Sequence, residues 1–361
     1  MMRNAVPPVP AYIATLEPYK SGRSMTKGNA WIFMDSGECT APLPYSVDLQ
    51  TGINRYPDPT GDTLRDAIAS TYGLKRENVF LGCGIDEVLD RAITTFSPPG
   101  GKLLSFEPTF PPYRIFGQTQ GRTYISVPLT PDFGLQEEAA IAAARSADIV
   151  FICSPNNPTG TVLDPGVITK IIDAAPGLVV IDEAYGEFCE LQNLPVQIDS
   201  VRTGAKNVLV TRTFSKAYAA AGIRLGYGLA STEIIGELLK TKLPYNVNAL
   251  SQSIGCSLLE GRSAMEENVR ALLKSRALLA KGCKELGCTV SRSVTHFFLL
   301  QLPERYSAGN FYQFLRNTYR IAVRPFGIIN GKESLRVSTG TDEQNNLFLK
   351  ALSAFLSSKS L

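Results

Sequence analysis

The sequence predicts an α/β fold, in which a large domain with a mostly parallel sheet flanked by helices is followed by a smaller α+β domain. Three observations support this prediction. The chain has 361 residues, which is long for a single hydrophobic core. Short apolar runs alternate with longer helical patterns through its middle, as in a parallel sheet wrapped by helices. Beyond about residue 245 this alternation stops and a long helical pattern begins.

Six short apolar runs are the expected strands of the large domain. They cover residues 79–81, 102–106, 149–153, 178–181, 207–211 and 227–230. Amphipathic stretches at 62–72, 135–145 and 165–174 lie between several of them. Because parallel strands need long crossover connections, each of these stretches is an expected crossover helix.

The end of the chain predicts the smaller domain. A helical segment over 249–286 precedes two expected strands at 297–301 and 335–338. The first 45 residues are rich in Pro, Gly and Ser and show little periodicity. We therefore expect an arm over 1–45 that packs on the small domain or on a partner subunit, a large domain over 46–248 and a small domain over 249–361.

Composition argues against several classes of protein. The 36 basic and 33 acidic side chains give a net charge of +3 without a long basic run, so nucleic-acid binding is not supported. No stretch approaches the roughly 20 apolar residues that span a bilayer, and the start MMRNAVPPVPAY lacks the apolar core of a signal peptide. We expect a cytoplasmic protein without membrane contact.

The cysteines and the one histidine restrict the chemistry. Seven cysteines without paired spacing indicate neither a disulfide framework nor a zinc site. His296 is the only histidine, so a site with several histidine ligands is excluded and a Ser-His-Asp hydrolase would need this residue. It lies in the apolar run 294–300, which favours a position in the core or in an edge strand.

Polar motifs follow several of the expected strands at their carboxyl ends. They are SPNNPTG at 154–160, DEAY at 182–185, RTFSK at 212–216 and GIRLG at 222–226. Each alone is a weak signal, because such residues are common in turns, strand caps and solvated surfaces. In an open parallel sheet, however, a ligand binds beyond the carboxyl ends of the strands. Their joint order therefore indicates one site.

Together with NRYP at 54–57, these motifs resemble the fold type I pyridoxal-phosphate (PLP) enzymes. Within the class I/II aminotransferases the resemblance is closest to the histidinol-phosphate aminotransferase-like subfamily. It runs from about residue 19 to about residue 341 and is strongest over 54–226. It implies a large PLP-binding domain and pyridoxal 5'-phosphate as the cofactor.

The resemblance also implies catalytic roles. Lys216 matches the family lysine that forms the Schiff base and then moves a proton between the substrate and the cofactor. Asp182 matches the carboxylate that keeps the pyridine nitrogen protonated. Asn157 and Tyr185 match the groups that hydrogen-bond the phenolic oxygen, and Phe110 matches the aromatic ring that stacks on the cofactor.

The cofactor phosphate requires N–H groups at a helix N-terminus, and a glycine-rich turn at residues 82–87 precedes a helical pattern. The residues implied for the phosphate are Gly84, Ile85, Asp86, Thr213, Ser215 and Arg224. Tyr56 matches a tyrosine that reaches the phosphate of the neighbouring subunit. This match implies a homodimer with a shared active site.

The substrate end combines a match with a departure. Arg336 aligns with the small-domain arginine that binds a carboxylate or phosphate, and Arg324 and Tyr19 resemble its companions. The subfamily usually shows Ala-Ser-Asn-Glu-Asn-Pro where this chain has DSGECT at 35–40. Gly37 and Cys39 thus replace both asparagines, which allows a changed substrate or a changed reaction.

Three functions remain open at this point. The first is a PLP-dependent aminotransferase that moves an amino group between a small anionic amine or amino acid, resembling histidinol phosphate, and a 2-oxo acid. The second is a decarboxylase of the threonine-phosphate type, or an elimination or cyclisation enzyme acting on a hydroxylated arginine-type amino acid in natural-product biosynthesis. The third is a non-catalytic binding protein, which the presence of both Lys216 and Asp182 disfavours.

Overall fold

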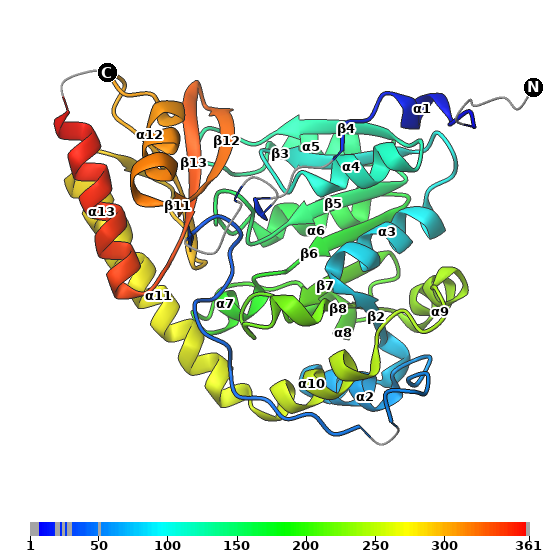
Figure 1. Cartoon of the computed structure of the whole chain (residues 1–361). Helices are drawn as coiled ribbons and strands as arrows, with labels where there is room; N and C mark the ends of the chain where they lie inside the picture. Colours follow the sequence, from blue (N-terminus) through cyan, green and yellow to red (C-terminus); the bar gives the residue numbers. More distant parts are fainter. Residues whose placement is uncertain (1–6, 19–21, 24–25, 27–30, 50–51, 359–361) are drawn as a thin grey trace, which may run out of the picture.

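The computed structural model describes residues 7–18, 22–23, 26, 31–49 and 52–358. A seven-stranded sheet in the order β2-β8-β7-β6-β5-β3-β4 forms its centre (Figure 1). β8 runs antiparallel to both neighbours, whereas the other pairs are parallel, which confirms the predicted fold class. The strands are β2 (Val79–Cys83), β3 (Lys102–Glu107), β4 (Thr123–Pro128), β5 (Ile149–Cys153), β6 (Leu178–Asp182), β7 (Val208–Thr213) and β8 (Leu225–Ala230).

The central strands are buried along their whole length. Every residue of β5, β6 and β7 is buried, and β5 and β6 are apolar runs without alternation. This pattern is typical of parallel strands that are covered on both faces. β4 lies at the edge of the sheet, and its mixed, partly exposed sequence TYISVP explains why the apolar pattern did not predict it.

Helices flank this sheet, as expected for strands joined by crossovers. α6 shows a well-marked start, because Pro165 is its first residue and the Asp164 carboxylate accepts hydrogen bonds from the first turn. The helices of this part are α2 (Asp62–Tyr72), η2 (Arg76–Asn78), α3 (Gly84–Phe96), α4 (Pro112–Thr119), α5 (Glu137–Ala144), α6 (Pro165–Ala174), α7 (Gly186–Glu190), α8 (Ile198–Arg202), η3 (Ala221–Ile223) and α9 (Thr232–Thr241).

A second hydrophobic core lies around a four-stranded antiparallel sheet in the order β12-β13-β10-β9. The long helix α11 runs beside α13 on this part of the molecule (yellow and red in Figure 1). The elements that follow α9 are α10 (Ala249–Glu260), which packs on α2 in the first core, and then α11 (Arg262–Glu285), β9 (Thr289–Val290), β10 (Phe297–Gln301), α12 (Ala308–Phe314), η4 (Leu315–Tyr319), β11 (Ile321–Ala322), β12 (Arg324–Ile329), β13 (Lys332–Ser338) and α13 (Asp342–Ser357).

Several expected elements have bounds that differ by one to three residues, and two of the differences have a clear structural cause. The helical segment expected over 249–286 is two helices, because the chain turns at Gly261, whose N–H closes α10 on the carbonyl of Ser257. The strand expected at 207–211 begins at Val208 and continues to Thr213. Asn207 precedes it and donates its side-chain amide to the carbonyls of Ile172 and Ala175.

The two short elements in the described part of the first 45 residues pack on different parts of the molecule. α1 (Ala11–Ala14) packs on α4, and the Tyr12 ring lies beside Gly121. β1 (Ile32–Phe33) instead pairs in parallel with β11. In the described ranges, no helix combines the length and the apolar character that crossing a membrane requires.

Candidate active site

A cavity of about 510 Å³ lies at the carboxyl ends of β5, β6 and β7, with walls from the large sheet and from the small domain. Its size is typical of small-molecule sites. Most of the residues that the sequence singled out line it, namely Ile85, Asp86, Phe110, Asn157, Asp182, Tyr185, Thr213, Ser215, Lys216, Arg224, Arg324 and Arg336. The structure thus brings together motifs that are more than 200 positions apart along the chain.

Lys216 lies three residues after the end of β7, and its amine points into the cavity wall. The Nζ atom donates to the carbonyl oxygen of Ser36 at 2.9 Å and lies 3.4 Å from that of Gly37. Burial, and after it the charge of Arg336, together lower the pKa of Lys216 to about 8. The amine is therefore closer to its neutral, nucleophilic form than an exposed lysine.

Asp182 is the last residue of β6 and is buried. Its Oδ2 accepts a hydrogen bond from the Tyr113 hydroxyl at 2.6 Å, and its Oδ1 accepts one from the backbone N–H of Ala184 at 3.0 Å. Burial raises the pKa of Asp182 to about 6, although both hydrogen bonds favour the charged form. A carboxylate held in this way suits a cationic ring nitrogen.

An aromatic wall supports this carboxylate. Phe110 lines the cavity and meets the Tyr113 ring edge-on, with 5.5 Å between centroids. Tyr113 in turn stacks on Phe151 at 4.8 Å. Tyr113 was not among the predicted site residues, although it lies in the same PTFPPY segment. The only sequence signal for Tyr113 is its place three residues after Phe110, in the first turn of α4. A buried tyrosine there needs a hydrogen-bond partner for its hydroxyl.

The other end of the cavity suits an anion. α3 begins at Gly84, whose φ is +73°, and no side chain caps this helix N-terminus. The hydroxyls of Thr213 and Ser215 lie 3.0 Å apart. Arg224 lies 3.4 Å from the carboxylate of Asp86. Free N–H groups, two hydroxyls and a guanidinium together form an anion-binding end.

Gly84 lies directly beside the Arg224 guanidinium at this anion-binding end. A Cβ atom on residue 84 would lie 2.6 Å from the guanidinium of Arg224 and would displace it, and the positive φ of this residue also favours glycine.

Two arginines mark the small-domain wall. Arg324 and Arg336 are direct partners across the antiparallel pair of β12 and β13, and both line the cavity. Arg336 donates to the side-chain oxygen of Asn157 at 2.7 Å and to the backbone carbonyl of Asp35. Like charges opposite each other in a sheet are unfavourable, so an anionic ligand bound between them would be favoured.

One predicted residue lies away from the cavity, and another is not among the described residues. Tyr56 is 77% exposed and stacks on Tyr245 with 4.4 Å between ring centroids, away from the cavity of its own chain. Tyr19 lies outside the described residues.

The donor set fits PLP at three points: the uncapped α3 N-terminus for its phosphate, the buried Asp182 for its ring nitrogen, and the Lys216 amine for its aldehyde. These points surround one cavity. The residues present are therefore compatible with this cofactor.

Comparisons with known proteins agree with this geometry. The family described as aminotransferase class I and II matches residues 40–352. A histidinol-phosphate aminotransferase from Parabacteroides distasonis is 35% identical over 341 residues, covering 93% of this chain and 94% of that protein.

Two solved structures are similar in fold. A histidinol-phosphate aminotransferase from Sinorhizobium meliloti in complex with pyridoxal-5'-phosphate has a TM-score of 0.87 at 22% identity, covering 98% of this chain and 99% of that one. An L-threonine-O-3-phosphate decarboxylase from Porphyromonas gingivalis has a TM-score of 0.72 at 25% identity, covering 84% and 91%. This chain belongs to the class I and II aminotransferases, and pyridoxal phosphate is its cofactor.

Proposed function

We propose that this aminotransferase takes its amino group from a small amine or amino acid with an anionic end, of which histidinol phosphate is the first candidate, and passes it to a 2-oxo acid. The observation that carries this proposal is the pair Arg324 and Arg336, which face each other across two strands on the cavity wall. Two guanidinium groups match the oxygens of a phosphate or carboxylate. The name of the Parabacteroides distasonis relative supplies the candidate substrate.

When bound, PLP supplies an aldehyde and an electron-withdrawing ring. Lys216 would hold the cofactor through its amine and afterwards move the proton of the substrate α-carbon. Asp182 would keep the ring nitrogen protonated, and Phe110 would pack on the ring face. Asn157 and Tyr185 would donate hydrogen bonds to the phenolic oxygen. These roles rest on the positions of the five side chains around one cavity.

The phosphate of the cofactor occupies the anion-binding end. Its ligands in this proposal are the first residues of α3 and the groups after β7, namely Gly84, Ile85, Asp86, Thr213, Ser215 and Arg224. Asp86 contributes its backbone N–H, while its carboxylate orients the guanidinium of Arg224. Tyr19 would join Arg324 and Arg336 at the substrate end.

The active enzyme in this proposal is a homodimer in which Tyr56 reaches the site of the partner subunit. Tyr56 belongs to a group of exposed apolar side chains on neighbouring segments, which we call the Tyr56 surface. Its members are Tyr45, Val47, Ile53, Tyr56, Leu243, Tyr245 and Leu250. An exposed apolar surface of this kind is typical of a protein interface.

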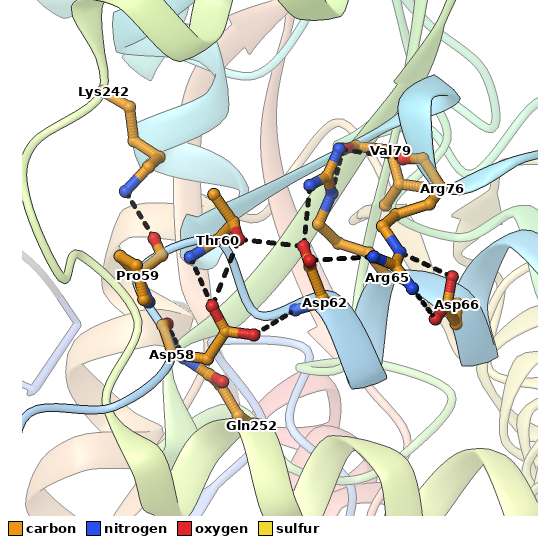
Figure 2. A network of polar contacts seen from close by, with 10 residues as sticks. All are labelled: Asp58, Pro59, Thr60, Asp62, Arg65, Asp66, Arg76, Val79, Lys242 and Gln252. Carbon is orange, nitrogen blue, oxygen red and sulfur yellow. Dashed lines mark hydrogen bonds and ion pairs between the residues drawn. The ribbon is translucent and has the colours of Figure 1, made fainter.

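A polar network fixes the turn that follows Tyr56 (Figure 2). The carboxylate of Asp58 accepts hydrogen bonds from the backbone N–H groups of Thr60 and Asp62 at 2.9 and 2.7 Å. Lys242 donates to the carbonyl of Pro59, and Gln252 donates to that of Asp58. The turn is thereby tied to α2, α9 and α10, so Tyr56 projects from a rigid base.

In this proposal the cofactor lies mainly on the large domain, residues 46–248, and the small domain, 249–361, supplies the substrate arginines, with 1–45 as an arm. The enzyme works in the cytoplasm. All seven cysteines are free thiols, which suits a reducing compartment.

The test is an absorbance spectrum of the holoenzyme with one candidate amine at a time and no 2-oxo acid. Histidinol phosphate should convert the cofactor from its aldehyde form to its amine form and release a carbonyl product. Return of the aldehyde form together with carbon dioxide would instead establish the decarboxylase reaction. Return of the aldehyde form with a cyclised product would establish the cyclase reaction.

A further inference from the structure

His296, the only histidine of the chain, lies one residue before β10, and its side chain is fully buried. The ring stacks on Phe188 with 5.0 Å between centroids and lies 5.9 Å from the Tyr185 ring. Its Nε2 atom is 2.9 Å from the carbonyl oxygen of Gly37. Because a carbonyl only accepts, this contact places the proton on Nε2.

The protonation state of the ring agrees with this assignment. Burial, followed by the charge of Lys216, lowers the pKa of His296 to about 3, and Nδ1 has no hydrogen-bond partner. The ring is therefore neutral and donates one hydrogen bond, to Gly37. This buried contact joins residues that are 259 positions apart.

Gly37 belongs to the segment in which the sequence departs from the family pattern. Its φ is +62°, and its N–H donates to the Ser338 hydroxyl at 3.1 Å. Ser36 and Gly37 both turn their carbonyls toward the amine of Lys216. The segment is thus fixed from three sides, by β13, by Lys216 and by His296.

A side chain at residue 37 would be closely surrounded on three sides. A Cβ atom there would lie 3.3 Å from Lys216 Nζ, 3.5 Å from His296 Nε2 and 3.6 Å from the Tyr185 hydroxyl. The positive φ disfavours other residues as well. Cys39, the second departure, contacts the same lysine from another side, since its thiol lies 3.1 Å from the Lys216 carbonyl.

We propose that His296 is a positioning residue for the reaction, whose Nε2–H holds the carbonyl of Gly37, and with it the segment Ser36–Gly37, beside the Lys216 amine. The inference rests on the proposed role of Lys216. Once that amine serves the cofactor, it no longer donates to the two carbonyls. His296 then remains as the donor that keeps the segment in place at the substrate end. In this arrangement the carbonyl of Gly37 accepts the one hydrogen bond that the His296 ring donates.

The test compares two replacements of similar size in the holoenzyme. In His296→Gln the side-chain amide keeps a donor near the Nε2 position, whereas His296→Met lacks one. We expect the Met variant to lose about tenfold to hundredfold in kcat and the Gln variant to stay within about threefold of the original. The Tm and the cofactor absorbance of the two variants should be similar. Equal kcat in both variants would overturn the proposal.

A second measurement needs no substitution and no substrate. Labelling of histidine with ¹⁵N gives signals from a single ring, in the chain with and without PLP. We expect the neutral Nε2–H form from about pH 6 to about pH 9 in both states. An imidazolium at about pH 6, or a proton on Nδ1, would contradict the contact. If no amine is transaminated, the proposed function fails, whereas this result still decides the role of His296 in holding Gly37.

Discussion

At the scale of single residues, burial acts in opposite directions on the two groups most important for the chemistry. It lowers the pKa of the Lys216 amine and raises that of the Asp182 carboxyl, because each loses solvation of its charged form. In the proposed function the ring of the cofactor would reverse the second effect, since a positive charge beside Asp182 favours the carboxylate. The site is therefore electrostatically adapted to a ligand with a protonated ring nitrogen.

Replacement of Lys216 tests the central role. Lys216→Ala should lower the rate of the half-reaction by a factor of about 10³, because it removes the group that transfers the proton. Single-turnover absorbance measures this rate. Lys206→Ala is a suitable control, because Lys206 precedes the opposite end of β7 and is exposed. Equal losses in both variants would contradict a specific role.

Tyr113 offers a pH-dependent test. Its hydroxyl donates to Asp182 and thereby lowers the pKa of that carboxyl, so Tyr113→Phe should raise it. Because the cofactor ring needs the ionised carboxylate, PLP affinity should decline as the pH falls through about 6, and the variant should show this decline at a higher pH. Titration of PLP binding at several pH values measures the pH at which the affinity declines in each protein. A shift to lower pH would contradict the argument.

At the scale of residues, the sequence predicts the position of a candidate site residue when that residue follows an apolar strand. Asp182 and Lys216 each follow an apolar run, so their place in a parallel sheet could be inferred before any coordinates. Tyr113 and His296 could not be found in the same way. Tyr113 acts through a carboxylate 69 positions away, and His296 acts through a carbonyl 259 positions away. Neither contact leaves a local pattern.

At the scale of elements, a buried charge cluster joins the loop after β6 to β7. Arg212 is fully buried, and its guanidinium donates to Glu183 at 2.6 and 3.0 Å. Its Nη1 also lies 3.0 Å from Glu190 and 3.4 Å from Glu187. A Cβ on Gly186 would be 2.3 Å from the guanidinium carbon, so the loop packs directly on this group. The cluster thus fixes the loop between Asp182 and α7.

Removal of the cation should be costly. Arg212→Met leaves Glu183 buried without its partner, and we expect a loss of about 3–5 kcal/mol in the free energy of unfolding. Urea unfolding followed by tyrosine fluorescence measures the change. Lys206→Met breaks the exposed pair with Glu233 and should cost less than about 1 kcal/mol. A loss of the same size in both variants would show that burial of the pair is unimportant.

Replacement of Glu187 should stabilise the folded chain, in contrast to replacement of Arg212. Its carboxylate lies 3.4 Å from the Arg212 guanidinium, and burial nevertheless raises its pKa to about 7. Between its ordinary pKa of 4.5 and about 7, the unfolded chain releases this proton while the folded chain keeps it, so ionisation disfavours folding as the pH rises. Glu187→Gln should therefore gain on the order of 3 kcal/mol relative to the original chain across this range. Urea unfolding at several pH values measures the gain, and a constant difference would contradict it.

At the scale of elements, the pattern of apolar runs predicts only the buried strands. It located the buried central strands, but it did not locate β12, whose sequence RPFGII is partly exposed and contains a bulge. The register of β12 against β13 places Arg324 opposite Arg336. The resemblance named both arginines, yet only the register shows that they share one wall of the cavity.

At the scale of the whole molecule, the site depends on segments brought together from the full length of the chain. Arg336 of the small domain donates to Asn157 of the large domain and to Asp35 of the N-terminal segment. Figure 1 shows the small domain, with α11 and α13, beside the carboxyl ends of β5 and β6. The exposed Tyr56 surface lies on the segments 45–47, 53–56 and 243–245 and on α10, and it is the proposed contact with a second subunit.

Mixing of two inactive variants tests the shared site. In the proposed dimer, each site combines Lys216 of one subunit with Tyr56 of the other. Lys216→Ala and Tyr56→Ala subunits, unfolded together and refolded in equal amounts, should recover about a quarter of the original activity. Half of the dimers are then mixed, and each mixed dimer has one intact site.

The Tyr56→Ala protein refolded alone gives the background. If Tyr56 served only its own chain, no intact site would form and mixing would add nothing. Recovery above the background would therefore support both the dimer and the direction in which Tyr56 acts.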